Sequence, residues 1–153
     1  MELKIRQATN ADAEAVRALV YGVLAEYCLS PDPQATDQDL EDIEGNYINN
    51  RGDFIVVEEN GVLNACMGVF RIDPHTCELR KMYAIPAARG RGLGKTLMDY
   101  ALQRARDLGY SRMVLETASP LKEAISLYIK YGFTPYHPDH LSCRCDQAFA
   151  LDL

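Results

Sequence analysis

The spacing of apolar residues predicts a chain that alternates between short strands and amphipathic helices. Apolar side chains recur at i, i+3 and i+4 over Val16–Leu24 and over Leu93–Leu108, which places them on one face of an α-helix. Phe54–Glu58 and Val62–Ile72 have the composition of strands, and the Asn-Gly dipeptide between them is a strong hairpin signal. These segments predict two helices and one hairpin.

The rest of the chain extends this alternation. Asn10, Thr36 and Ser119 are the expected helix caps. The complete order is β-α-α-β-β-β-α-β-α-β-β, which predicts an α/β fold with a mixed sheet in a single domain over residues 1–153. The remaining strands are expected at Leu3–Ala8, Glu78–Ile85, Met113–Glu116, Phe133–Tyr136 and Leu141–Leu151.

Composition narrows the class of protein. The 153 residues are 48% hydrophobic and 25% charged, which is typical of a soluble globular domain with a real core. No apolar run is long enough to span a membrane, and the first residues lack the apolar region of a signal peptide. The five cysteines form an odd, scattered set. We expect a cytoplasmic protein with reduced thiols and no membrane partner.

Charge is unevenly distributed along the chain. The net charge of −6 argues against nucleic acid as a partner. Residues 1–60 hold thirteen acids and four bases, a net of −9, whereas residues 61–153 hold nine acids and twelve bases, a net of +3. The basic part suits an anionic ligand. The acidic part faces either a cationic substrate or only solvent.

A glycine-rich hexapeptide, Arg89–Gly94, joins a predicted strand to the predicted helix Leu93–Leu108. Unpaired N–H groups and the helix dipole favour an anion at a helix N-terminus, and glycine lets a phosphate approach the backbone. Arg89, Arg91 and Lys95 add positive charge. The segment predicts a pyrophosphate site.

Three glycine-rich templates can be compared with this segment. A P-loop needs glycine where Arg89 stands, and the dinucleotide fingerprint needs glycine where Lys95 stands. The pattern Arg/Gln-x-x-Gly-x-Gly/Ala is met in full. With Glu78–Pro86 before it and Leu127–Phe133 after it, the chain resembles the GNAT superfamily of N-acetyltransferases.

The resemblance implies that acetyl-CoA binds as co-substrate, without a metal, in a V-shaped gap where the fourth and fifth strands splay apart. It implies direct transfer of the acetyl group to a primary amine by one N-acetyltransferase domain. The family pattern implies that the co-substrate is bound by Met82, Tyr83, Ala84, Ile85, Arg89, Gly90, Arg91, Gly92, Leu93, Gly94, Lys95, Thr117, Ser119 and Tyr128. A backbone N–H near Met82 or Tyr83 would stabilise the oxyanion.

Two residues are candidates for proton transfer. Tyr128 resembles the tyrosine that many members place near the cofactor sulfur, as a general acid; otherwise it is a core aromatic residue. Glu78 is the candidate general base, directly or through water; otherwise it is a strand residue paired with Arg80 or Lys81. Glu116 and Glu26 are competing bases, and some family members rely on solvent instead.

The acceptor is expected to be an amine of a small molecule or peptide. The acidic stretch Asp32–Glu44 would attract a cationic acceptor; alternatively, its acids stabilise a helix start through the dipole. By analogy with the family, a homodimer through the final strand pair is possible.

Other readings of these residues stay open. His137, His140, Cys143 and Cys145 are zinc-ligand types, but core packing of an alternating strand also explains the cysteines. Cys66 or Cys77 would be disfavoured as nucleophiles in apolar strands. The alternatives to an enzyme are a non-catalytic acyl-CoA sensor or regulatory module of the same fold and a P-loop-like nucleotide binder.

Overall fold

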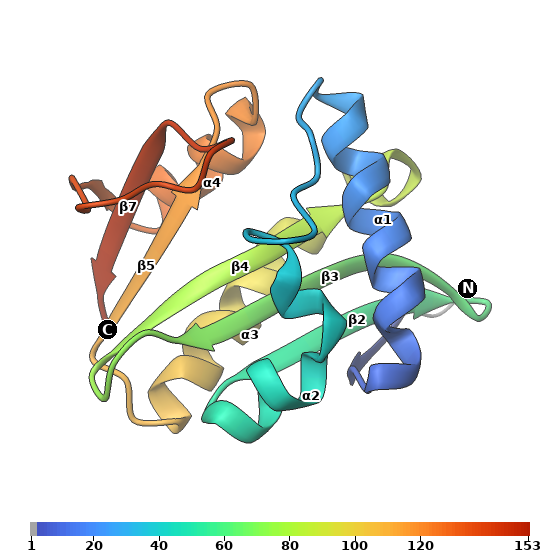
Figure 1. Ribbon diagram of the computed structural model, residues 1–153, viewed down its shortest axis with the longest axis horizontal. Coiled ribbons are helices and arrows are strands. Elements are labelled where there is room, and N and C mark those ends of the chain that lie inside the picture. The colour runs from blue at the N-terminus through green and yellow to red at the C-terminus, as the bar shows by residue number, and fades with distance from the viewer. Residues whose placement is uncertain (1–2) are drawn as a thin grey trace.

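One mixed sheet runs through the computed structural model, which describes residues 3–153 (Figure 1). The strand order is β1-β2-β3-β4-β5-β7-β6, and β4 and β5 are the parallel pair among otherwise antiparallel neighbours. The strands are β1 (Lys4–Gln7), β2 (Asp53–Glu59), β3 (Val62–Arg71), β4 (Thr76–Ala84), β5 (Arg112–Thr117), β6 (Thr134–Pro135) and β7 (Gln147–Asp152).

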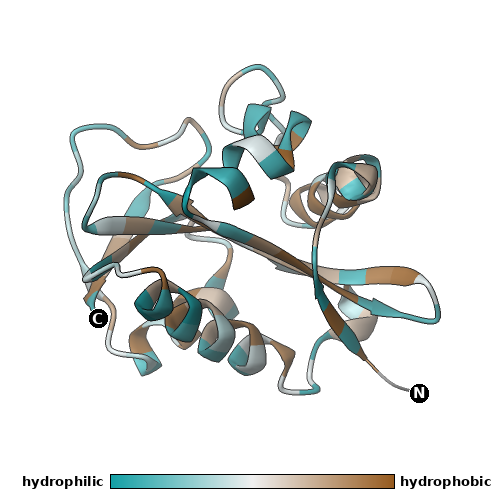
Figure 2. Cartoon of the chain, turned by 90° about the horizontal axis from the view of Figure 1, so that it is seen from below, coloured by the Kyte–Doolittle hydropathy of each residue, from teal (hydrophilic) through white to brown (hydrophobic). Residues whose placement is uncertain are grey.

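Helices cover both faces of this sheet (Figure 2). They are α1 (Ala13–Glu26), the short α2 (Ile43–Asn46), α3 (Leu93–Asp107) and α4 (Lys122–Lys130). Short 3₁₀ turns occur at Asn10–Asp12, Gln38–Glu41, Ile48–Asn50 and Pro86–Ala88. The predicted order of elements and the mixed α/β fold are confirmed. No helix in residues 3–153 has the length and apolar character needed to cross a membrane.

Strand β2 shows why the sheet needs helices on both faces. Phe54 and Val56 are buried in one core with α1 and α2, while Ile55 and Val57 are buried in the other with α3 and α4. Because side chains alternate along a strand, a continuous apolar run is the pattern expected of a strand buried on both sides.

The end of the chain differs from the predicted strand Leu141–Leu151. Strand β7 begins only at Gln147, and residues 136–146 form a loop. Its backbone bonds are made locally or to β5 and β7. The N–H of Tyr136 donates to Ala148 on β7, that of Ser142 to the carboxylate of Glu116, and that of Asp146 to the carbonyl of Thr117. The strand alternation proposed for Cys143 and Cys145 was therefore wrong.

The three predicted caps are also placed differently. Asn10 lies in a 3₁₀ turn before α1, and its side chain bonds Asp42 and the N–H of Glu44. Thr36 precedes short turns rather than one helix, because the Gly- and Asn-containing segment after it favours turns. Ser119 bonds Asp146, and α4 begins three residues later.

Strands β4 and β5 separate after three paired residues. Their pairing runs from Thr76 opposite Arg112 to Glu78 opposite Val114 and then ends, although both strands continue. Figure 1 shows them diverging toward the ends that lie near α1 and α4. Just beyond the last β4–β5 pair, the register between β3 and β4 shifts between Arg80 and Tyr83, and Lys81 has a positive φ of 55°. This is a β-bulge, which bends a strand and re-aims its side chains.

Candidate functional site

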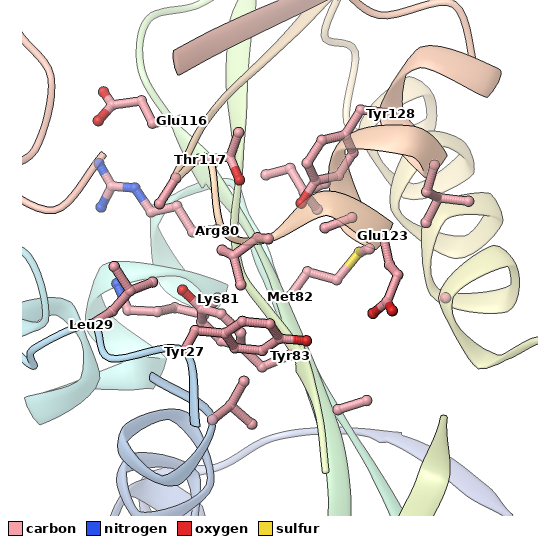
Figure 3. Close-up of a pocket in the computed structure, with 18 of the residues that line it drawn as sticks. Tyr27, Leu29, Arg80, Lys81, Met82, Tyr83, Glu116, Thr117, Glu123 and Tyr128 are labelled. Carbon is pink, nitrogen blue, oxygen red and sulfur yellow. The ribbon is translucent and has the colours of Figure 1, made fainter. Parts of the chain in front are cut away.

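The separation of β4 and β5 opens a cleft of about 1140 Å³. One end, called here the glycine-turn end, is lined by Arg89, Gly90, Gly92, Leu93 and Gly94. The other, called the charged end, is lined by Glu78, Arg80, Glu116 and Arg144. Figure 3 shows side chains from both separated strands and from α4 pointing into this space. Other lining residues include Tyr27, Leu29, Thr36, Lys81, Met82, Tyr83, Ala84, Thr117, Glu123, Tyr128, Ser142 and Cys145.

The glycine-turn end has the geometry of an anion site. Gly90 and Gly92 adopt φ values of 76° and 75°, and no atom lies within 4 Å of a Cβ built on either residue. Gly92 is the N-cap of the fifteen-residue helix α3, so the first N–H groups of this helix have no intrahelical acceptor. The glycines therefore allow a left-handed turn and leave room beside these donors, as an anionic pyrophosphate group needs.

The basic side chains around this turn already have partners. Arg89 lines the cleft, pairs with both carboxylate oxygens of Glu26 and donates from Nε to the carbonyl of Ala84. Arg91 pairs with Glu59 at 3.3 Å, and the exposed Lys95 pairs with Asp99. Neither Arg91 nor Lys95 lines the cleft. Glu26, one of the competing candidate bases, is thus held in an ion pair with Arg89 at the glycine-turn end.

Most of the other predicted contact residues do reach the cleft. Met82, Tyr83, Ala84, Gly94 and Thr117 line it. The hydroxyl oxygen of Thr117 is buried without a hydrogen-bond partner among residues 3–153. A buried hydroxyl of this kind is satisfied by a polar ligand, so the cleft fits the amides of a pantetheine arm. Leu93 also lines the cleft, whereas Ile85 and Ser119 do not.

Tyr128 projects from α4 into the cleft (Figure 3). Its ring packs against Phe133 and Phe149, with centroids 5.9 and 6.4 Å away. Burial, with a smaller contribution from Tyr83, raises the pKa of Tyr128 above its ordinary value. Burial likewise raises the pKa of Tyr83 to about 12. Both phenols therefore keep their protons throughout the neutral pH range.

Glu78 and Glu116 lie on neighbouring strands at the charged end. Glu78 is 8% exposed and accepts a hydrogen bond from Nε of Arg80, as the pairing interpretation predicted, although it is buried rather than solvated. Burial raises the pKa of Glu78; Arg80 opposes this shift and Glu116 adds to it. A carboxyl group with a raised pKa is a better proton acceptor near neutral pH.

A buried charge network beneath the charged end was not foreseen. Lys81, 4% exposed, contacts Asp37 and Asp39 at 3.2 Å each, and Arg144 donates to both oxygens of Asp37. Tyr47 donates to Asp39. In sequence, only the adjacent pair Arg80 and Lys81 inside a predicted strand hints at these contacts.

This network changes the interpretation of the acidic stretch Asp32–Glu44. Asp37 and Asp39 are paired with buried cations, and Asp42 caps α2 by accepting the N–H of Gly45. No carboxylate of the stretch lines the cleft in residues 3–153. Structural pairing accounts for most of its acids, so attraction of a cationic acceptor by this stretch stays a prediction.

The cysteines and histidines of residues 3–153 give no support to a nucleophilic thiol or to a metal site. Burial raises the pKa of the thiols of Cys66 and Cys77 to about 12, so neither forms a reactive thiolate near neutral pH. Within residues 3–153, no three His, Cys, Asp or Glu side chains are grouped to hold a metal ion. Zinc binding by the four residues from His137 to Cys145 therefore gains no support.

Comparison with known proteins gives the same assignment. Residues 18–133 match the sequence model of the acetyltransferase (GNAT) family. The uncharacterized N-acetyltransferase YjgM of Escherichia coli is 37% identical over 134 residues, which cover 84% of this chain and 80% of that protein. An uncharacterized N-acetyltransferase of Schizosaccharomyces pombe is 32% identical, covering 83% of this chain and 79% of that protein.

Solved structures share the fold. A GNAT-family acetyltransferase from Staphylococcus aureus superposes with a TM-score of 0.91 at 21% identity, covering 99% of each chain. A putative acetyltransferase from Salmonella typhimurium, solved with acetyl-CoA, gives a TM-score of 0.76 at 23% identity, covering 98% of this chain and 93% of that one. With its splayed strands and its glycine turn at a helix start, the chain belongs to the acetyltransferase (GNAT) family and is an acetyltransferase.

Proposed function

We propose that this protein transfers the acetyl group of acetyl-CoA directly to the primary amine of a small molecule. The observation that carries the proposal is one continuous cleft with an anion site at one end and paired carboxyl groups at the other. Acetyl-CoA supplies the anion and the thioester. Glu78 and Glu116 supply proton acceptors where an amine would approach.

A small acceptor is favoured over a folded protein by the loops at the charged end. Arg144 and Asp37, on loops from the two sides of the cleft, are joined by hydrogen bonds of 2.7 and 2.8 Å. Asp37 is fully buried and the Arg144 side chain is 9% exposed. A bidentate pair of this kind has fixed geometry, so it restricts the space for a bulky acceptor.

The proposed reaction needs no acyl-enzyme. The ammonium group of the acceptor first loses a proton to Glu78, directly or through water, because only a neutral amine has a free electron pair. Its nitrogen attacks the thioester carbonyl carbon, the C–N bond forms and the C–S bond breaks. The phenol of Tyr128 gives its proton to the departing thiolate, and the nitrogen, which carries an extra proton after the attack, returns one to the phenolate through water as the neutral amide forms. Lys81 and Met82 have no register partner on β3, and we place the backbone N–H that would stabilise the oxyanion at this bulge.

Thermal unfolding in the presence of ligands tests the cofactor site. At 100 times its Kd, a ligand stabilises the folded state by about 2.7 kcal/mol. For a domain of this size, acetyl-CoA and CoA should each raise the Tm by about 5–10 °C. Mg-ATP at the same concentration is the control and should leave the Tm unchanged. A rise with Mg-ATP alone would contradict acetyl-CoA binding and favour a nucleotide site.

A pH profile tests Glu78 as the general base. Because the pKa of Glu78 is raised, the acidic limb of kcat/KM should lie above the ordinary glutamate value of about 4.3, with activity falling as pH falls through it. Glu78→Gln should remove this limb and lower kcat/KM at neutral pH by about 10²-fold. Glu116→Gln is the matched variant and should keep the limb. If Glu116→Gln removes it instead, Glu116 is the base.

A further inference from the structure

Arg80 presents an unused pair of donors to the charged end of the cleft. Its Nε donates to Glu78, but Nη1 lies 3.9 Å from Asp39, beyond hydrogen-bond range. Neither Nη1 nor Nη2 has an acceptor among residues 3–153, and the side chain is 27% exposed where it lines the cleft. The two Nη groups of a guanidinium are spaced to bind both oxygens of one carboxylate.

The plane of this guanidinium is fixed before any ligand arrives. Its carbon lies 3.7 Å from the ring centroid of Phe70, in a cation–π contact, while Glu78 holds its Nε. Phe70 is held in turn by an edge contact with Tyr47. An arginine held in this way loses little rotamer freedom on binding, which favours affinity for a planar anion.

The other cations at this end are already occupied. Lys81 uses its three donors on Asp37, Asp39 and the carbonyl of Thr36. Arg144 uses both Nη groups on Asp37. Among the cations that line the charged end in residues 3–153, Arg80 is therefore the one whose Nη groups donate no hydrogen bond, although Nη1 forms a long ion pair with Asp39.

A complementary anion lies on the same side of the cleft. Glu116 accepts the N–H of Ser142 at one carboxylate oxygen, and its other oxygen has no hydrogen-bond partner in residues 3–153. Figure 3 shows Glu116 and Arg80 on the side of the pocket opposite Tyr128. Because Arg80 balances Glu78 and the buried network is balanced internally, Glu116 is the carboxylate at the charged end that is left to receive an ammonium group; Glu123 lines the cleft on the side of Tyr128.

We propose that the acceptor is a free amino acid, whose carboxylate binds the Nη1–Nη2 edge of Arg80 and whose amino group lies at Glu116 and Glu78. This inference rests on the proposed acetyl transfer to a small amine. It differs from the cationic acceptor suggested by the acidic stretch. A polyamine lacks the carboxylate, and the N-terminus of a peptide carries a neutral amide in its place.

Matched acceptors test this assignment. Each of a panel of L-amino acids is compared with its own carboxamide and with its decarboxylated amine, for example leucine, leucinamide and isoamylamine. CoA release is measured at equal concentrations of the neutral amine, so that differences in amine pKa do not affect the comparison of kcat/KM. For the preferred side chain, kcat/KM should favour the free amino acid over both analogues by about 10- to 100-fold.

Arg80→Met then tests the residue. The ratio of kcat/KM for the amino acid to that for its carboxamide should fall by about 10- to 100-fold. A ratio is used because any disturbance of Glu78 by the substitution slows acetylation of both acceptors equally. Arg112→Met removes the same charge from an arginine that stacks on Tyr136 outside the cleft, and its ratio should equal the wild-type ratio. Arg80→Lys, which keeps the charge but loses the paired donors, should restore only part of the ratio.

Two results would overturn the inference. One is a preference for carboxamides or decarboxylated amines across the panel; the other is an unchanged ratio in Arg80→Met. Either leaves acetyl transfer intact, because CoA release still depends on an amine. Failure of the proposed function is recognised separately, by the absence of a Tm shift with acetyl-CoA and CoA.

Discussion

Tyr128→Phe should lower kcat by about 10²- to 10³-fold and leave the KM for acetyl-CoA within about threefold of the wild-type value. The variant removes only the hydroxyl, so the thiolate must leave without a proton from the enzyme. The ring contacts with Phe133 and Phe149 are kept, and the hydroxyl has no hydrogen bond to another group in residues 3–153. The Tm should therefore change little. Steady-state kinetics and a thermal melt on the same preparation measure both quantities.

Tyr131→Phe is the matched control for this change. Tyr131 lies three residues further along the chain, and its hydroxyl bonds Asp99 on α3, outside the cleft. This variant should keep kcat within about twofold. If Tyr128→Phe retains full kcat while acetyl-CoA binding is normal, Tyr128 is only a core aromatic residue and the thiolate is protonated by solvent.

The pH dependence of the wild type gives a further expectation for Tyr128. Burial raises the pKa of Tyr128, so its proton is present at every pH at which the protein is normally assayed. The activity should therefore show no basic limb from Tyr128 below about pH 10.

The order of elements was predictable because each has a local signal. The i, i+3, i+4 spacing over Val16–Leu24 and the Asn-Gly hairpin depend on near neighbours in the chain, and both elements are present as predicted. The glycine turn has a local signal as well, since Gly92 must adopt a positive φ to cap α3. Resemblance to a family then gave the expectation that this turn binds the pyrophosphate of acetyl-CoA.

The charged end of the cleft lacked such a signal. Arg144 and Asp37 are 107 residues apart in sequence, and Lys81 and Asp39 are 42 apart, yet both pairs are in contact. The bulge at Lys81 places Arg80 and Lys81 on the same face of β4, which the strict alternation of a regular strand would not allow. Sequence alone therefore left two interpretations of the acidic stretch open, because the pairing of its buried acids depends on residues far away in the chain.

Lys81→Met should destabilise the protein by about 3 kcal/mol, the lower end of the range for breaking a buried ion pair. Methionine keeps most of the volume but removes the ammonium group that Asp37 and Asp39 share. The loss is not larger because Arg144 still pairs with Asp37 and Tyr47 still donates to Asp39. Urea unfolding at pH 7 measures the change, and Lys130→Met, on the exposed end of α4, should stay within about 0.5 kcal/mol of the wild type.

The destabilisation caused by Lys81→Met should depend on pH. Burial acts to raise the pKa of Asp37, but hydrogen bonds from Arg144 and the backbone, with the charge of Lys81, outweigh it and hold the pKa below its ordinary value. A carboxyl group whose pKa is lowered by folding stabilises the folded state above about pH 4, and this contribution is lost as pH falls through the folded-state pKa. Lys81 supplies part of that contribution, so the difference in unfolding free energy between wild type and Lys81→Met should be smaller at pH 3 than at pH 7. A difference that is independent of pH would mean that Lys81 acts through the packing of its aliphatic chain, and that the two aspartates do not depend on its charge.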